Sequence, residues 1–245
     1  MNKGRRILAI LAMGSSAGAC YLQHSFNRLG KRPDDPESNS EILPGQNALF
    51  KAYPGLTAHI PWASVSHLPS PVEELGSVLG LSEGMLWVKR DDLISPFYGG
   101  NKVRKLEHLL EDARKGGHRS LITIGVLGSN HCLSTAIHGR KKGFNVHLCL
   151  TDQQITGTVR QTLAGFLAAG AKVHHCTDNR NAYNTMRSLF RELKKKGENP
   201  YIIFSGGTSG LSDFGHVNAA FEIARQVKTG EIPEPDKLFV AVGTC

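Results

Sequence analysis

The sequence predicts an α/β fold built of open, mostly parallel sheets with helices on both faces. Two observations lead to this class. From residue 86 onward, short apolar runs alternate with longer segments whose apolar residues recur at helical spacing. Glycines such as Gly170 and Gly197 close the longer segments and separate them from the next apolar run. Strands that alternate with helices form βαβ units, and such units build a parallel sheet covered by helices.

Each element has its own pattern. Residues 85–93, MLWVKRDDL, begin with an apolar run suited to a strand. In the next segment Leu106, Leu109 and Leu110 share one helical stripe. The run LITIGV at 121–126 is apolar almost throughout, which is typical of a buried strand. The expected helices are residues 102–115, 131–142, 158–169, 182–196 and 216–227. The remaining expected strands are residues 145–150, 171–176, 201–204 and 237–242.

The charge of the chain raises the question of a nucleic-acid partner, because the formal net charge is +8. The basic residues are spread out, however, and RELKKK at 191–196 fits the end of a helix, where the dipole favours cations. No basic stripe interleaved with aromatic residues occurs. We therefore expect no nucleic-acid partner.

The cysteines do not predict a disulfide framework or a zinc site. The chain has 5 cysteines, an odd number, and they stand far apart without a CxxC pair. The HHC triplet at 174–176 lies in an expected strand, where successive side chains face opposite ways and cannot easily converge on one ion. We expect no metal site.

The N-terminus differs from the rest of the chain. Basic residues within 1–6 precede an apolar run at 7–13 and the small residues GSSAGAC, and no acidic residue occurs before Asp34. This pattern resembles a signal peptide, a lipoprotein signal with Cys20 as the lipidated residue, or a transit peptide, while the run is too short to span a membrane. A plain N-terminal extension of a cytoplasmic protein fits equally well. Both a cytoplasmic and a targeted location stay open, and the proline-rich residues 32–40 read as a linker.

The first of three loops that could carry chemistry is Gly-Gly-Asn-Lys at 99–102. Its glycines relax steric limits, so that backbone can approach a ligand closely. Lys102 follows in the first turn of a helix, where the positive end of the dipole lowers the pKa of an amine. A neutral lysine is what Schiff-base chemistry needs. The alternative is a surface lysine in a helix that also holds Arg104 and Lys105, which are interpreted as ordinary helix charges.

The second loop, Gly-Ser-Asn-His at 128–131, directly follows the strand LITIGV. Ser129 is well placed to cap the next helix, and its hydroxyl could instead handle a proton. Asn130 could give a planar hydrogen bond to a ligand oxygen. His131 could titrate near neutral pH, although a single histidine is more often structural.

The third loop, Ser-Gly-Gly-Thr-Ser-Gly at 205–210, follows the strand YIIF. A glycine-rich loop can present backbone N–H groups to an anion. It fits neither the dinucleotide-binding spacing nor a Walker A loop, so a flexible turn is the alternative.

Together these loops resemble a family. The strings LWVKRDDL, YGGNKVRKLE, GSNH and SGGTSGL with GHVNAAFEIA are similar, in this order, to 1-aminocyclopropane-1-carboxylate deaminases and D-cysteine desulfhydrases. The resemblance runs from about residue 50 to the end. It implies a two-domain pyridoxal-phosphate enzyme of fold type II, the tryptophan-synthase-β type, acting as a homodimer on a small amino acid. It also implies a large domain from residues 34–111 with 214–245, and a small α/β domain from residues 112–213, after a possible targeting segment at 1–33.

The resemblance implies roles for individual residues. In the family the lysine of Gly-Gly-Asn-Lys binds the cofactor covalently, which corresponds to Lys102. The asparagine of Ser-Asn-His contacts the ring hydroxyl of the cofactor, which corresponds to Asn130, and the neighbouring Ser129 acts near the substrate. Gly243 and Thr244 correspond to the start of the phosphate-binding loop. The implied reaction converts D-cysteine or 1-aminocyclopropane-1-carboxylate to a keto acid and ammonia, with sulfide from D-cysteine.

The sequence departs from the family in two places. Gly128 stands where the family has a glutamine, which bears on substrate preference. The phosphate-binding loop has barely begun at the last residue, so we expect a C-terminally incomplete enzyme. Two alternatives stay open: an inactive remnant or partner module with this fold, and an unrelated nucleotide- or nucleic-acid-binding α/β domain.

Overall fold

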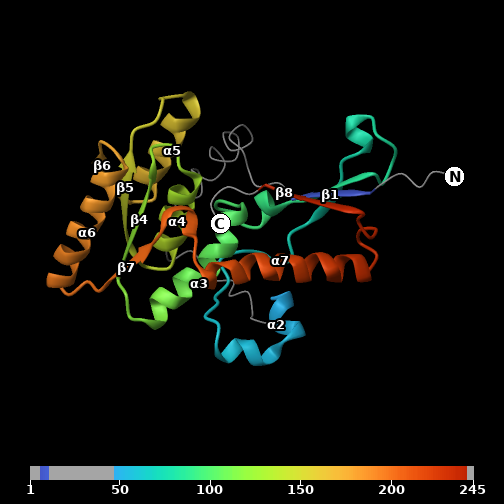
Figure 1. Ribbon diagram of the computed structural model, residues 1–245, viewed down its shortest axis with the longest axis horizontal. Helices are drawn as coiled ribbons and strands as arrows, with labels where there is room; N and C mark the ends of the chain where they lie inside the picture. The colour runs from blue at the N-terminus through green and yellow to red at the C-terminus, as the bar shows by residue number, and fades with distance from the viewer. Residues whose placement is uncertain (1–5, 11–46, 242–245) are drawn as a thin grey trace.

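The computed structural model describes residues 6–10 and 47–241, which form two four-stranded sheets and the helices that pack on them (Figure 1). The first sheet, here called the β4 sheet, has the order β6-β5-β4-β7 and is parallel throughout. Its strands are β4 (Ser120–Val126), β5 (Asn145–Thr151), β6 (Lys172–Cys176) and β7 (Pro200–Ile203). The second, here called the β1 sheet, has the order β2-β3-β1-β8, with only β2 antiparallel. Its strands are β1 (Ile7–Ile10), β2 (Val72–Glu74), β3 (Leu86–Lys89) and β8 (Lys237–Val240).

Helices connect these strands. The α-helices are α2 (Ala48–Ala52), α3 (Asn101–Lys115), α4 (Asn130–Lys141), α5 (Gly157–Ala168), α6 (Asn179–Lys195) and α7 (Gly210–Lys228). The 3-10 helices are η3 (Pro54–Ala58), η4 (Ser77–Leu79), η5 (Asp91–Leu93) and η6 (Ser205–Gly207). Every strand and helix predicted from residue 85 onward is present, and the prediction of an α/β fold with mostly parallel sheets is confirmed.

The β4 sheet has helices on both faces because its central strand β4 carries apolar side chains on both faces. Leu121 packs in the cluster that includes α4 residues Leu133 and Ile137, whereas its neighbour Ile122 packs with Met186 of α6. Figure 1 shows α6 on one side of this sheet and α4 on the other. Successive side chains of a strand point to opposite faces, so one strand supplies both cores. Fully burying a side chain of this size contributes about 1.5–3 kcal/mol.

Strand β1 was not predicted. It lies between β3 and β8, parallel to both, and Leu8 is 1% exposed, packed with Ile223 of α7 and Ile232. The apolar run at 7–13 was interpreted as part of a targeting segment or an extension, because basic residues precede it and small residues follow it. The remainder of that run, with Cys20 and most of the segment 1–33, lies outside the described residues.

Helix α7 packs across α3 at very close range. A Cβ on Gly215 would lie 2.4 Å from the carbonyl oxygen of Arg104, so only glycine fits this crossing. The helix begins at Gly210, six residues before the predicted start at 216. Ser209 and Ser212 form a capping box there, with a serine in place of the usual glutamate, which explains why the start was missed.

Two expectations about the chain as a whole concern membranes and domains. Within residues 6–10 and 47–241, no helix has the length and apolar character needed to cross a bilayer. The division into residues 34–111 with 214–245, and residues 112–213, stays a prediction.

Candidate active site

The first loop places Lys102 at the start of α3 through two unusual glycines. Gly100 has φ of 107°, in the region that favours glycine, and its N–H donates to the Asp91 carbonyl at 2.6 Å. A Cβ on Gly99 would lie 1.9 Å from the carbonyl oxygen of Asp92. The close approach predicted for these glycines is therefore made to the chain's own backbone after β3, and it fixes where α3 begins.

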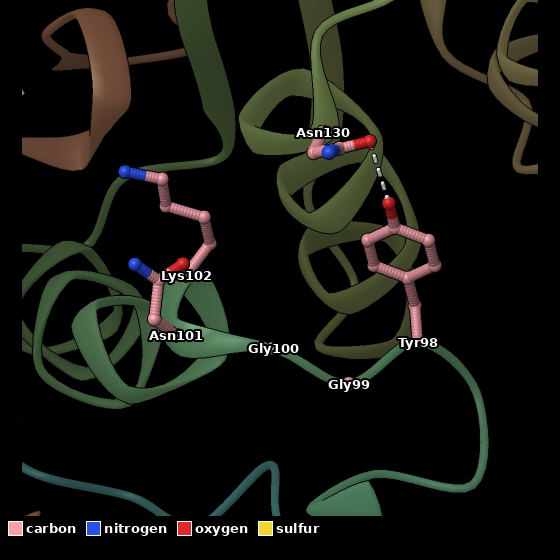
Figure 2. A pocket seen from close by; sticks show the side chains of 6 residues that line it. All are labelled: Tyr98, Gly99, Gly100, Asn101, Lys102 and Asn130. Carbon is pink, nitrogen blue, oxygen red and sulfur yellow. Dashed lines mark hydrogen bonds between the residues drawn. The ribbon is translucent and has the colours of Figure 1, made fainter. Parts of the chain in front are cut away.

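Lys102 is half-buried and lies beside the third loop. Its Nζ donates to the carbonyl oxygen of Gly206 at 3.2 Å. It also lines a pocket, drawn in Figure 2, whose residues are Tyr98, Gly99, Gly100, Asn101, Lys102 and Asn130. The structure thus brings together the lysine and the asparagine that the sequence singled out from separate loops.

Asn130 is the first residue of α4, at the carboxyl end of β4. Its Oδ1 accepts a hydrogen bond from the Tyr98 hydroxyl at 3.0 Å (Figure 2). Tyr98 precedes Gly99 in the first loop and was not among the predicted site residues. The first and second loops are therefore linked by a direct side-chain contact.

Ser129 caps α4, which is one of the two roles that the sequence predicted for it. Its Oγ accepts from the N–H of Cys132 at 3.2 Å. A role near the substrate stays a prediction. Next to it, the Gly128 N–H donates to Oε1 of Gln153 at 2.9 Å, and a Cβ on Gly128 would lie 2.8 Å from that oxygen. A glutamine side chain from the loop after β5 thus lies against Gly128.

His131 is a buried histidine with one bonded nitrogen. Its Nε2 lies 3.0 Å from Oγ1 of Thr123, while its Nδ1 has no hydrogen-bond partner among the described residues. Burial, with smaller effects from Lys102 and Lys105, lowers the pKa of His131 to about 3. The suggestion that it titrates near neutral pH is wrong, because its site disfavours the imidazolium form.

The third loop reaches the same place. Gly206 and Gly207 have φ of 70° and 69°, and Gly207 packs so that an added Cβ would lie 3.3 Å from Cε1 of His131. With the contact from Lys102 to Gly206, this brings all three loops around one region at the starts of α3 and α4. Consecutive glycines of this kind are more than a flexible turn, since a side chain would be strained at both.

Arg104 and Lys105 are not the exposed helix charges that the sequence suggested. Arg104 is 0% exposed and Lys105 is 2% exposed. The Nζ of Lys105 lies 3.5 Å from Oγ1 of Thr208 in the third loop. Charged residues in a helix are normally exposed, and the helix sequence alone does not show when partners elsewhere in the chain allow them to be buried.

The partners of Arg104 form a buried group, here called the Arg104 network. It holds both carboxylate oxygens of Asp91 after β3 and both carboxylate oxygens of Glu222 on α7. Lys89 adds a second cation, with Nζ 2.9 Å from Glu222. Ser70 donates to Asp91 at 2.8 Å. The network fastens the first turns of α3, and therefore Lys102, to β3 and α7.

The predicted phosphate-binding residues Gly243 and Thr244 lie outside the described residues, which end just after β8. Their role stays a prediction.

The chemistry of the pocket suits an aldehyde cofactor with an anionic ring oxygen. A lysine amine forms covalent links with carbonyl groups, and an amide N–H donates to a negatively charged oxygen. Lys102 and Asn130 supply these two groups to one pocket at helix N-termini. The residues present therefore fit pyridoxal phosphate, with Lys102 as the residue that would hold it, and this role stays a prediction.

Comparison with known proteins gives the family. The family model described as pyridoxal-phosphate dependent enzyme matches residues 64–245, and the chain belongs to this family. The predicted cofactor is thereby confirmed at the level of the family.

Individual relatives agree with the resemblance. The chain is 36% identical over 175 residues to the bifunctional D-cysteine desulfhydrase/1-aminocyclopropane-1-carboxylate deaminase, mitochondrial, of Arabidopsis thaliana, covering 67% of this chain and 43% of the relative. It is 31% identical over 186 residues to a D-cysteine desulfhydrase of Salmonella paratyphi B (strain ATCC BAA-1250 / SPB7), covering 72% and 55%. A crystal structure of an ACC deaminase homologue superposes with a TM-score of 0.62 at 29% identity, covering 76% and 55%. The chain thus spans about half the length of these relatives.

Proposed function

We propose that the chain is part of an enzyme that uses pyridoxal phosphate to convert a small amino acid to a keto acid and ammonia. The substrate would be of the D-cysteine or 1-aminocyclopropane-1-carboxylate type, in line with the names of the two relatives. The observation that carries the proposal is the pocket shared by Lys102 and Asn130. The overall change consumes one water: D-cysteine gives pyruvate, sulfide and ammonia, and the cyclopropane amino acid gives 2-oxobutanoate and ammonia.

Each pocket residue has a defined task in this proposal. Lys102 would hold the cofactor covalently through Nζ, and Asn130 would donate to its ring oxygen. When bound, pyridoxal phosphate supplies an electron sink that stabilises negative charge at the α-carbon of the substrate. Gly243 and Thr244 would contribute to the site of its phosphate.

Proton transfer falls to the chain's own groups. The Lys102 amine hydrogen-bonds to the Gly206 carbonyl, and this contact would keep it in the pocket when it is not linked to the cofactor. An amine in that place can hold a proton taken from the substrate. Ser129 is proposed as a second proton-handling group, in addition to capping α4.

Further expectations belong to the same proposal. We expect the whole protein to be a homodimer, with a large domain and a small domain divided as predicted. The mitochondrial name of the Arabidopsis relative supports a targeted location, while a cytoplasmic one stays open.

The test is a product assay on the 245-residue chain supplied with pyridoxal phosphate. D-Cysteine, 1-aminocyclopropane-1-carboxylate and a panel of small amino acids are incubated with it, and keto acid, sulfide and ammonia are measured. We expect products from one of the two named substrates, lost in Lys102→Ala and kept in Lys115→Ala, a change at the exposed end of the same helix. Cofactor binding without turnover on any substrate would instead support the inactive binding module.

A further inference from the structure

The hydrogen bond between Tyr98 and Asn130 indicates a role for a residue outside the predicted site. We infer that Tyr98 is a positioning residue, which turns the Asn130 side chain so that its NH2 group is presented to the cofactor's ring oxygen. This inference rests on the proposed function, because it concerns how the same pocket recognises pyridoxal phosphate.

A side-chain amide has two different ends, and only one of them suits an anionic oxygen. The oxygen accepts hydrogen bonds, whereas the NH2 group donates them. Since the Tyr98 hydroxyl donates to Oδ1 of Asn130, the NH2 group is left for the pocket. Figure 2 shows the amide nitrogen on the side of Lys102 and the amide oxygen directed to Tyr98. The reverse orientation would turn a lone-pair oxygen towards the ligand and repel it.

The phenol of Tyr98 stays protonated, so it acts as the donor in this hydrogen bond. Its side chain is 7% exposed, and burial raises the pKa of Tyr98 to about 12. Tyr98 belongs to the apolar core cluster that includes Leu106, Leu109 and Leu133. Because the Tyr98 hydroxyl keeps its proton at physiological pH, it bonds to the oxygen of the Asn130 amide and not to the nitrogen.

Tyr98 is itself held in place from behind. Its carbonyl oxygen accepts from Nε2 of His138, at 2.8 Å. Burial lowers the pKa of His138 to about 4, so the ring is neutral and carries its proton on Nε2 in this contact. His138 and Asn130 both belong to α4, two turns apart. Helix α4 therefore contacts Tyr98 twice: His138 bonds to its backbone carbonyl, and Asn130 accepts from its hydroxyl.

The neighbouring glycine removes the remaining freedom of this loop. Gly99 lies directly against the backbone of Asp92, so the segment cannot shift towards η5 without a clash. Tyr98 is thus held through its backbone and through its hydroxyl, and the Asn130 amide nitrogen lies on the side of Lys102 (Figure 2). Such support is how a recognition group keeps its orientation before the ligand arrives.

The experiment titrates the purified chain with pyridoxal phosphate and measures the dissociation constant by visible absorbance. Tyr98→Phe removes the hydroxyl and keeps the ring, and we expect about three- to ten-fold weaker binding, the range for one lost hydrogen bond. Tyr201→Phe is the matched control. It removes a hydroxyl bonded to Asp112 at 2.7 Å, outside the pocket, and should leave the constant unchanged.

The second readout separates positioning from a general structural effect. In a double-mutant cycle, Tyr98→Phe should add nothing once Asn130 is replaced by alanine, because the hydroxyl acts through that amide. The visible circular dichroism of the bound cofactor should change in the same way in Tyr98→Phe and Asn130→Ala, and not in Tyr201→Phe. This signal reports how the ring is held and does not follow a mere loss of folding stability.

The outcomes are distinct. Equal affinity and an equal dichroism spectrum in Tyr98→Phe and the wild type would overturn the inference and leave the proposed function standing. A full effect of Tyr98→Phe in the Asn130→Ala background would also overturn it, since the hydroxyl would then act elsewhere. If the wild type itself binds no pyridoxal phosphate, the proposed function fails, and the inference fails with it.

Discussion

Arg104 and Asp91 form a two-fold hydrogen-bonded ion pair in the interior, with Nη2 to Oδ1 at 2.7 Å and Nε to Oδ2 at 2.8 Å. Neither side chain is more than 2% exposed. Arg104 stands two residues after Lys102, so this pair fastens the turn that carries the proposed cofactor lysine. Glu222 accepts from the same guanidinium and joins α7 to it. The position of Lys102 thus depends on buried charges of β3, α3 and α7.

Removing Arg104 should destabilise the protein strongly. Arg104→Ala leaves Asp91 and Glu222 facing one another without their main counter-ion, and breaking a buried pair in this way costs roughly 3–5 kcal/mol. Urea unfolding measures the change. Arg114→Ala, at the exposed end of the same helix, is the control: it removes a pair with Glu111 in which the arginine is 64% exposed, and it should cost about 0–1 kcal/mol. Similar losses in both variants would contradict the role given to the Arg104 network.

The pH dependence of stability should contain a contribution from Glu107. This carboxyl is 1% exposed, and burial raises its pKa to about 7, against the hydrogen bonds from Ser66 and Trp62. The folded state then binds more protons than the unfolded state between about pH 4.5 and 7, so this group's contribution falls as pH rises through that window.

Glu107→Gln tests the contribution directly. Buried histidines such as His138 have a lowered pKa and act in the opposite direction, so the comparison is between variant and wild type rather than with an absolute slope. Between pH 5 and 8 the variant should gain up to about 3 kcal/mol relative to the wild type, as measured by urea unfolding. Exposed Glu192→Gln should follow the wild type. An unchanged difference between Glu107→Gln and wild type at all pH values would show that Glu107 has an ordinary pKa.

Two glycines of α7 should respond in opposite ways to alanine. At Gly215 the new Cβ meets the backbone of Arg104 at 2.4 Å, so Gly215→Ala should force α3 and α7 apart and cost about 1–3 kcal/mol. At Gly210 nothing lies within 4 Å of the added atom, so Gly210→Ala should be neutral or slightly stabilising. Thermal unfolding distinguishes them. Equal effects of the two changes would mean that the crossing of α3 and α7 is looser than 2.4 Å implies.

Two substitutions of Ser129 should distinguish its capping of α4 from a role in proton transfer. Ser129→Ala removes the acceptor for the Cys132 N–H and should cost about 1 kcal/mol of stability. Ser129→Asn keeps a capping oxygen but lacks the hydroxyl, so its stability should stay near that of the wild type. If Ser129 handles a proton, Ser129→Asn should still lose turnover, measured as keto acid release at saturating cofactor. Full turnover in Ser129→Asn would leave capping as its whole function.

The roles of Lys102 and Asn130 came from the resemblance of whole motifs to a known family, because by pattern alone Lys102 also fits a surface lysine. The loops themselves were located because ligand-binding groups in an α/β fold stand where strands end and helices begin. That rule needs only local patterns. The Arg104 network lay beyond it, since Arg104 meets partners 13 and 118 residues away. No periodic pattern reports contacts at such separations. Tyr98 was missed for a related reason: an aromatic residue before two glycines gives no sign that its hydroxyl reaches a helix 32 residues on.

Strand β1 shows the same limit at the N-terminus. Four apolar residues after a basic segment fit a targeting pattern as well as a strand, and only the pairing with β3 and β8 decides between the two for residues 7–10. Pairing between strands far apart in sequence depends on the whole fold. Local propensity contributes little to it.

Chemical trapping shows whether Lys102 is the residue that holds the cofactor. The chain is incubated with pyridoxal phosphate, reduced with borohydride, digested and analysed by mass spectrometry. We predict that the added mass is found on the peptide carrying Lys102 and is absent in Lys102→Ala, while Lys115→Ala is labelled like the wild type. Labelling of another lysine in the wild type, with Lys102 unmodified, would contradict this role of Lys102.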